Sequence, residues 1–137
     1  MIKMSLTHFN KKEKEVIMAN TQKTFATVLG VVLLVVGLAG LVGGLGIVGP
    51  DGIFGTNMLH DVLHIIAGVW GIWIGTKGMG FGYNKVIGWI AILLAVLGFI
   101  PGVKEMMMTY LGADMAIAYL HAVIGIVALL VYHKGSR

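Results

Sequence analysis

The sequence contains no cysteine, which excludes disulfide bonds, thiolate metal sites, iron–sulfur clusters and covalent c-type haem attachment. It is also poor in charge, because only 12% of its 137 residues are Asp, Glu, Lys or Arg. A typical soluble domain has about 25%. By contrast, 58% of the residues are hydrophobic and the mean hydropathy is +0.92. This number of charged side chains is too small to solvate the surface of a globular protein. The composition therefore indicates an integral membrane protein whose partner is the lipid bilayer.

The few charged residues divide the chain into four uncharged runs. These runs cover residues 24–50, 62–76, 86–103 and 115–133. A helix needs about 20 residues to cross the hydrocarbon core, so the helix of the short second run is expected to begin near Asn57. Pro50 and Pro101 mark the ends of the first and third helices. The sequence therefore predicts an all-α bundle of four transmembrane helices, at about residues 24–48, 57–76, 84–102 and 114–133.

The basic residues predict the orientation of this bundle. Of the ten Lys and Arg residues, all but Lys104 fall on the side of the two termini and the 76–85 loop. These nine are Lys3, Lys11, Lys12, Lys14, Lys23, Lys77, Lys85, Lys134 and Arg137. Because basic residues favour the cytoplasmic side, we expect a bacterial inner-membrane protein with both termini in the cytoplasm. The net charge of +4 follows from this topology and does not indicate nucleic-acid binding.

The first 17 residues, MIKMSLTHFNKKEKEVI, are polar and stop abruptly at Met18. The peptide KEVIM can be encoded by AAG-GAG-GTG-ATC-ATG, which contains a strong bacterial ribosome-binding sequence upstream of the last codon. We therefore hypothesise that translation starts at Met18 and that residues 18–137 form a single transmembrane domain. The alternative is that residues 1–17 form a short basic cytoplasmic tail that contacts anionic lipid.

The second half of the chain resembles the first half. A shift of 57 residues aligns Asn57 with Asp114 and His64 with His121, and a shift of 58 aligns Gly40 with Gly98. We therefore expect two tandem two-helix repeats, related by a pseudo-twofold axis along the membrane normal.

Small residues recur on one face of each predicted helix, and such faces let helix backbones approach closely within membranes. The glycines expected to pack helices are Gly37, Gly40, Gly44, Gly68, Gly71, Gly75, Gly98 and Gly125.

His60 and His64 continue the small-residue face of the second helix, and His121 lies on the corresponding face of the fourth. A histidine within a membrane bundle is a candidate functional residue. The expected polar cluster comprises His60, His64, His121, Asn57, Asp61 and Asp114.

Three interpretations of this cluster remain open. The first is that the histidines only form hydrogen bonds between helices. The second is that His60, His64 and His121 bind a divalent metal ion, with Asp61 or Asp114 as ligand or support, or that His64 and His121 hold a b-type haem. The third is a proton or small-solute pathway, for which the ordinary pKa of histidine is suitable.

The segment FGTNMLHDVLH at residues 54–64, together with LGFIPG at 97–102, resembles a bacterial family of small four-helix membrane proteins catalogued as a domain of unknown function. The resemblance covers about residues 22–133 and implies the same four-span fold, with no established activity. A more distant similarity is to DoxX-type four-helix proteins, some of which are linked to redox chemistry, but a fold does not determine a function.

The sequence therefore predicts, in the first place, a non-enzymatic accessory or structural membrane component. A haem- or metal-binding redox subunit is the second interpretation, and a solute or proton pathway is the third. A homo-oligomer or a partner within a membrane complex is compatible with such a thin, glycine-rich bundle.

Overall fold

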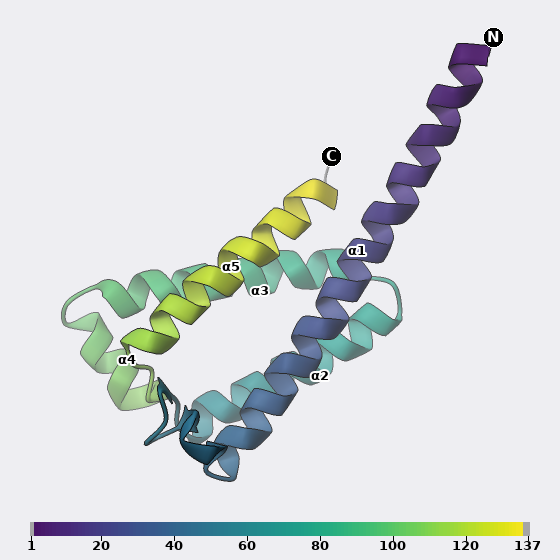
Figure 1. The fold of residues 1–137 in the computed structure, drawn as a ribbon. Helices are drawn as coiled ribbons and strands as arrows, with labels where there is room; N and C mark the ends of the chain where they lie inside the picture. The colour runs from purple at the N-terminus through teal and green to yellow at the C-terminus, as the bar shows by residue number, and fades with distance from the viewer. Residues whose placement is uncertain (1, 136–137) are drawn as a thin grey trace.

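The structure is a computed structural model that describes residues 2–135 and is almost entirely helical (Figure 1). Two of the residues used above, Met1 of the leader and the basic Arg137, lie outside the described residues. The helices are α1 (Ile2–Leu41), α2 (Met58–Thr76), α3 (Gly80–Phe99), α4 (Val103–Leu111) and α5 (Met115–Gly135). A short 3-10 turn, η1 (Gly44–Gly46), and two strands, β1 (Val48–Gly49) and β2 (Phe54–Gly55), connect α1 to α2.

Four helices are long and apolar enough to cross a membrane. They are α2, α3, α5 and the part of α1 from Asn10 to Leu41. Helix α1 packs mainly against α2, and α3 packs mainly against α5, so the bundle consists of two helical hairpins. Both chain ends and the turn between α2 and α3 lie at one end of the bundle, while α4 and the two strands lie at the opposite end (Figure 1). We call these the terminal end and the α4 end.

Helix α1 stops earlier than the sequence predicted. It ends at Leu41 and not near residue 48, so Gly44, expected on a helix face, lies in the turn η1. The reason is a run of left-handed backbone in which Gly43, Leu45 and Gly46 have φ of 94°, 53° and 76°. Glycine adopts such angles without steric cost, so this glycine-rich run ends the helix although it contains no charge.

The third predicted helix and the loop that follows it also differ from the expectation. Helix α3 covers Gly80–Phe99 where residues 84–102 were predicted, and α4 lies in the segment between the third and fourth predicted helices, where no helix was predicted. Ile100 is extended, as is usual for a residue before proline, and Pro101 therefore separates α3 from α4.

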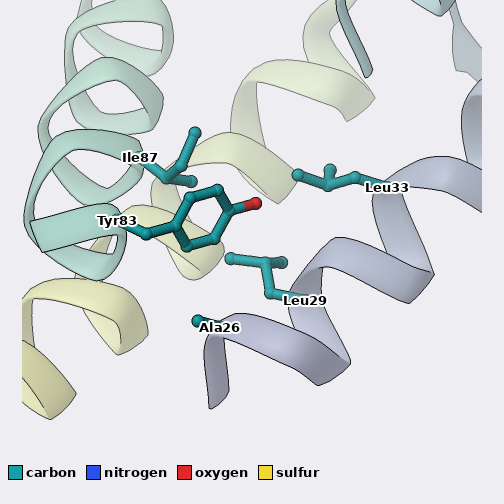
Figure 2. Close-up of a cluster of buried hydrophobic side chains, with 5 residues drawn as sticks. All are labelled: Ala26, Leu29, Leu33, Tyr83 and Ile87. Carbon is teal, nitrogen blue, oxygen red and sulfur yellow. The ribbon is translucent and has the colours of Figure 1, made fainter. Parts of the chain in front are cut away.

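The apolar core lies between α1 and α3 (Figure 2). It comprises Ala26, Leu29, Leu33, Tyr83 and Ile87. Tyr83 is 1% exposed and lies edge-on to Trp70, with ring centroids 4.9 Å apart. Its hydroxyl group donates a 2.9 Å hydrogen bond to the Ala67 carbonyl, so the one polar atom of this core side chain is satisfied.

Several glycines lie where another helix leaves no room for a side chain. A Cβ atom at Gly68 would be 2.5 Å from the backbone nitrogen of Leu34 on α1. A Cβ atom at Gly125 would be 2.7 Å from the side chain of Ile92 on α3. Similar close approaches occur at Gly37, Gly40, Gly71, Gly75 and Gly98.

A buried polar network joins three helices at the terminal end. Asn84 on α3 is 0% exposed, and its side-chain nitrogen donates to the side-chain and main-chain oxygens of Gln22 on α1, at 2.9 and 3.0 Å. The side-chain nitrogen of Gln22 donates to the Val131 carbonyl on α5. The sequence analysis did not single out either residue, although each is a polar residue close to the boundary of an apolar run.

Candidate metal centre

Three histidines from two helices come together at the α4 end of the bundle. His60 and His64 lie one helical turn apart on α2, and His121 lies on α5. We call these three residues the His trio. Although α1 and α3 provide the largest share of the contact between the two hairpins, the His trio joins α2 of one hairpin to α5 of the other.

The first turn of α2 is fixed by its N-terminal cap. Asn57 has an extended backbone, and its side-chain oxygen accepts a 3.1 Å hydrogen bond from the backbone N–H of His60. Asparagine is a favourable cap because it satisfies a backbone donor that has no partner within the helix. This cap determines where His60 stands on the helix.

Helix α4 supplies the second constraint on α2. The last carbonyl groups of a helix have no partners within it. Here the side-chain nitrogen of Asn57 donates to the Tyr110 carbonyl at 2.9 Å, and Nδ1 of His60 lies 3.1 Å from the Leu111 carbonyl oxygen. The C-terminal end of α4 is therefore bound to the N-terminal end of α2.

Gly112 allows this close contact between the two helix ends. It ends α4 with a left-handed φ of 65°, and a Cβ atom there would lie 2.7–2.8 Å from the backbone of Thr56 and Asn57. Both the backbone angle and the lack of space favour glycine at this position.

The start of α4 is held by its own acidic residue. The Glu105 carboxylate accepts a 2.6 Å hydrogen bond from the backbone N–H of Gly102. Hydrogen bonds from backbone N–H groups, first that of Glu105 itself and then that of Gly102, lower the pKa of this carboxyl, and Lys104 acts in the same direction.

The three imidazole rings lie close together. Ring centroids are 4.4 Å apart for His60 and His64, 5.5 Å for His60 and His121, and 6.2 Å for His64 and His121. One nitrogen from each ring falls in a group whose members all lie within 4.8 Å of one another. His60 is 3% exposed and His121 is 8% exposed. Three nitrogen ligands thus converge in a site from which most water is excluded.

The hydrogen bond to Leu111 determines which nitrogen of His60 is available. A carbonyl oxygen can only accept, so Nδ1 of His60 carries the proton and Nε2 of the neutral ring keeps its lone pair. Metal-binding histidines are usually held in this way, with the second ring nitrogen donating to a backbone carbonyl. His60 is therefore oriented as a metal ligand would be.

His64 contains an unsatisfied polar atom. Its Nδ1 is buried and has no hydrogen-bond partner among the described residues. Buried polar atoms are nearly always paired, so an unpaired imidazole nitrogen beside two other imidazoles is a candidate ligand atom.

Neither aspartate of the expected cluster belongs to the close group of histidine nitrogens. Asp114 caps α5, because one carboxylate oxygen accepts from the backbone N–H of Ile117 and the other from that of Gly55, both at 2.9 Å. Asp61 is 1% exposed, and its carboxylate faces Gly40 on α1. Among residues 2–135, the close group of candidate metal-binding side chains here contains histidines only.

The sequence analysis did not identify the backbone groups that orient His60, namely the carbonyls of Tyr110 and Leu111. Side-chain patterns cannot reveal a backbone acceptor, but two signals for α4 were present. Glu105 stands three residues after Gly102, and Gly112 follows the last helical residue. An acidic residue in the first turn and a glycine after the last are typical of helix ends.

The chain belongs to the family described as Domain of unknown function (DUF4383), whose match covers residues 23–133. No curated protein and no solved structure matches the chain. The matched segment includes α2 to α4 and nearly all of α5, and therefore all of the His trio.

Proposed function

We propose that this protein is a non-enzymatic membrane component that binds a divalent transition-metal ion at the His trio. The observation that carries the proposal is the convergence of three imidazole nitrogens, one from each of His60, His64 and His121, within 4.8 Å. The orientation of His60 by Leu111 and the unpaired Nδ1 of His64 both support it.

The donor set favours Zn²⁺, Cu²⁺ or Ni²⁺. Imidazole suits these ions, whereas Ca²⁺ and Mg²⁺ prefer oxygen ligands, and no carboxylate is part of this close group. Metal–nitrogen bonds of about 2.0–2.1 Å place tetrahedral ligands roughly 3.3 Å apart, so small side-chain rotations from the present separation of up to 4.8 Å would close the site. Three ligands leave a fourth position for water.

A b-type haem fits this arrangement less well. Its two axial imidazoles must stand on opposite faces of a flat macrocycle. The ring of His60 lies 4.4 Å from that of His64 and 5.5 Å from that of His121, so it occupies the space beside both candidate axial ligands. Three mutually close rings accommodate a single ion more readily than a porphyrin.

Helix packing alone explains the site less well too. That interpretation requires hydrogen bonds between the histidines or to Asn57 or Asp114. In the described part of the chain, the side-chain hydrogen bond of this cluster's histidines runs from His60 to Leu111, and Nδ1 of His64 has no partner. A pure packing role would leave this polar atom buried and unpaired, which is unfavourable.

We further propose the membrane setting that the charge pattern supports. Both termini face the cytoplasm of a bacterial cell, and the His trio lies near the outer surface of the inner membrane. The two hairpins correspond to two tandem repeats, and glycine faces pack the helices within each hairpin. The segment 54–64 and the distant DoxX similarity are consistent with this setting and add no activity.

The experiment is metal analysis of the full chain purified in mild detergent, before and after loading with Zn²⁺, Cu²⁺ or Ni²⁺. We expect about one ion per chain, lost when His60, His64 and His121 are all replaced by alanine. The matched control is His133→Ala, which removes a histidine at the terminal end and should retain the ion. Helical content measured by circular dichroism checks that each variant is folded. If the loaded, folded wild-type protein contains no ion, or if His133→Ala loses it equally, the proposal is wrong.

A further inference from the structure

A hollow of about 750 Å³ lies at the terminal end, between the first half of α1, the turn after α2 and the end of α5. Lys11, Lys14 and Lys134 line it, together with the apolar side chains of Met18 and Phe81. Small-molecule sites generally have volumes of about 300–1,000 Å³, so the hollow is large enough for the headgroup of one phospholipid.

The charge of the hollow is positive. Three lysines and one acidic residue, Glu15, line it. Among the described residues the ion pair joins Lys104 to Glu105, at the other end of the bundle, so none of the three lysines is in an ion pair, and the lysines outnumber the one carboxylate of the hollow. Three ammonium groups around one hollow attract an anion, and a phosphate group is the common anion at a membrane surface.

The hollow lies at the depth of lipid headgroups. Its lining includes Gln22, which is 4% exposed and belongs to the polar network with Asn84. Beyond Lys23, α1 carries no charge for the rest of its length. Nearby, Lys77 lies over the Trp73 ring and Lys85 over the Tyr132 ring, at 5.2 and 5.6 Å. Aromatic rings and lysines gather in this way where a helix leaves the hydrocarbon core.

Phe81 connects the hollow to the apolar surface of the bundle. It lines the hollow, is 39% exposed, and its ring packs against that of Tyr132 with centroids 4.6 Å apart. A ligand here would meet ammonium groups on one side and apolar surface on the other. A phospholipid has both parts, whereas free phosphate uses only the first.

We infer that this hollow binds the headgroup of an anionic glycerophospholipid, with Lys11, Lys14 and Lys134 around the phosphate and Met18 and Phe81 against the glycerol and upper acyl chains. The hollow is separate from the His trio, so the two proposals can fail independently. The hollow includes Lys11 and Lys14, so this inference adopts the alternative in which residues 1–17 are a basic cytoplasmic tail, in place of a translation start at Met18.

The test is native mass spectrometry of the full chain in detergent, titrated with phosphatidylglycerol or with phosphatidylcholine of the same acyl chains. We expect the wild-type protein to bind phosphatidylglycerol at least roughly tenfold more tightly. Replacing Lys11, Lys14 and Lys134 by glutamine should abolish this preference, and replacing them by arginine should preserve it. The chain beginning at Met18 should behave like the glutamine variant.

The matched control replaces Lys12, Lys23 and Lys77 by glutamine, which removes three exposed lysines of the same end that do not line the hollow. It should keep most of the preference. Equal loss in both glutamine variants would show diffuse attraction to the surface and overturn the inference, as would a wild-type protein without preference. Displacement of phosphatidylglycerol by equimolar inorganic phosphate would assign the hollow to free phosphate and overturn the lipid assignment.

Discussion

Nδ1 of His60 lies 3.1 Å from the carbonyl oxygen of Leu111, so one hydrogen bond joins the start of α2 to the end of α4. The bond satisfies a carbonyl that has no partner within α4, and it turns Nε2 of His60 away from α4. The orientation of this ring therefore depends on a helix that carries none of the three histidines.

Asn57 also positions His60, because its side-chain oxygen accepts a hydrogen bond from the His60 backbone N–H. Replacing Asn57 tests this role. Asn57→Ala removes both the cap of α2 and the donor to Tyr110, so we expect a loss of about 1 kcal/mol in unfolding free energy. We also expect metal affinity to fall by roughly 10- to 100-fold, as when an outer support of a metal ligand is removed. Thermal unfolding and metal titration of the same sample measure the two effects.

Asn57→Ser separates these two contributions. Serine also caps helices but is too short to reach Tyr110, so most of the stability should return while metal affinity stays low. Unchanged metal affinity in Asn57→Ala would contradict the proposed support of His60.

Glycine substitutions test how closely the helices approach. Gly68→Ala places a methyl group 2.5 Å from the backbone of Leu34, which cannot move without shifting α1. We expect this variant to lose roughly 1–3 kcal/mol of unfolding free energy, as overpacked sites do. Denaturation in detergent, followed by circular dichroism, measures the change.

The matched control for Gly68 is Gly82→Ala on α3. Nothing lies within 4 Å of a Cβ atom at Gly82, and alanine favours a helix by up to about 1 kcal/mol over glycine. This variant should be as stable as the wild-type protein or slightly more so. Equal destabilisation of both variants would mean that helix contact does not explain the effect at Gly68.

The lowered pKa of Glu105 leads us to expect that the stability of the start of α4 depends on pH. Its pKa is lowered in the folded protein, so its stabilising contribution is present above the ordinary value of 4.5 and is lost as pH falls through the lowered value. The backbone amide of Gly102 reports this change, because it donates to the carboxylate. NMR of this amide between about pH 6 and pH 2 should show a titration with a midpoint below 4.5.

Glu105→Gln provides the control, because its side-chain oxygen still accepts the hydrogen bond but does not titrate in this range. The Gly102 amide should then show no such transition. A transition of the same size in Glu105→Gln would assign the titration to another group.

The sequence predicts the location of most helices because charged residues are local signals. The uncharged run after Asp61, extended to the length of a membrane span, predicts a helix from near Asn57, and the structure has this helix at Met58–Thr76. The end of α1 is missed because the run from residue 24 to residue 50 contains no charge at all. There, backbone angles at Gly43 and Gly46 end the helix, and hydropathy does not report such angles.

Only part of the candidate site could be predicted from the sequence. The spacing of His60 and His64 follows from helical periodicity, whereas the approach of His121 depends on how two hairpins pack. The roles of the two aspartates were not distinguishable in advance. Asp114 stands where an N-terminal cap is common. Only the packing of Gly40 against Asp61 shows that the Asp61 carboxylate points toward α1.

The distribution of the His trio over two hairpins has a thermodynamic consequence. His60 and His64 belong to the hairpin of α1 and α2, and His121 belongs to that of α3 and α5. An ion that binds all three can do so only when the hairpins are assembled, so by linkage it stabilises assembly by as much as assembly strengthens its own binding. Metal concentration would then set how strongly the assembled state of the two hairpins is favoured.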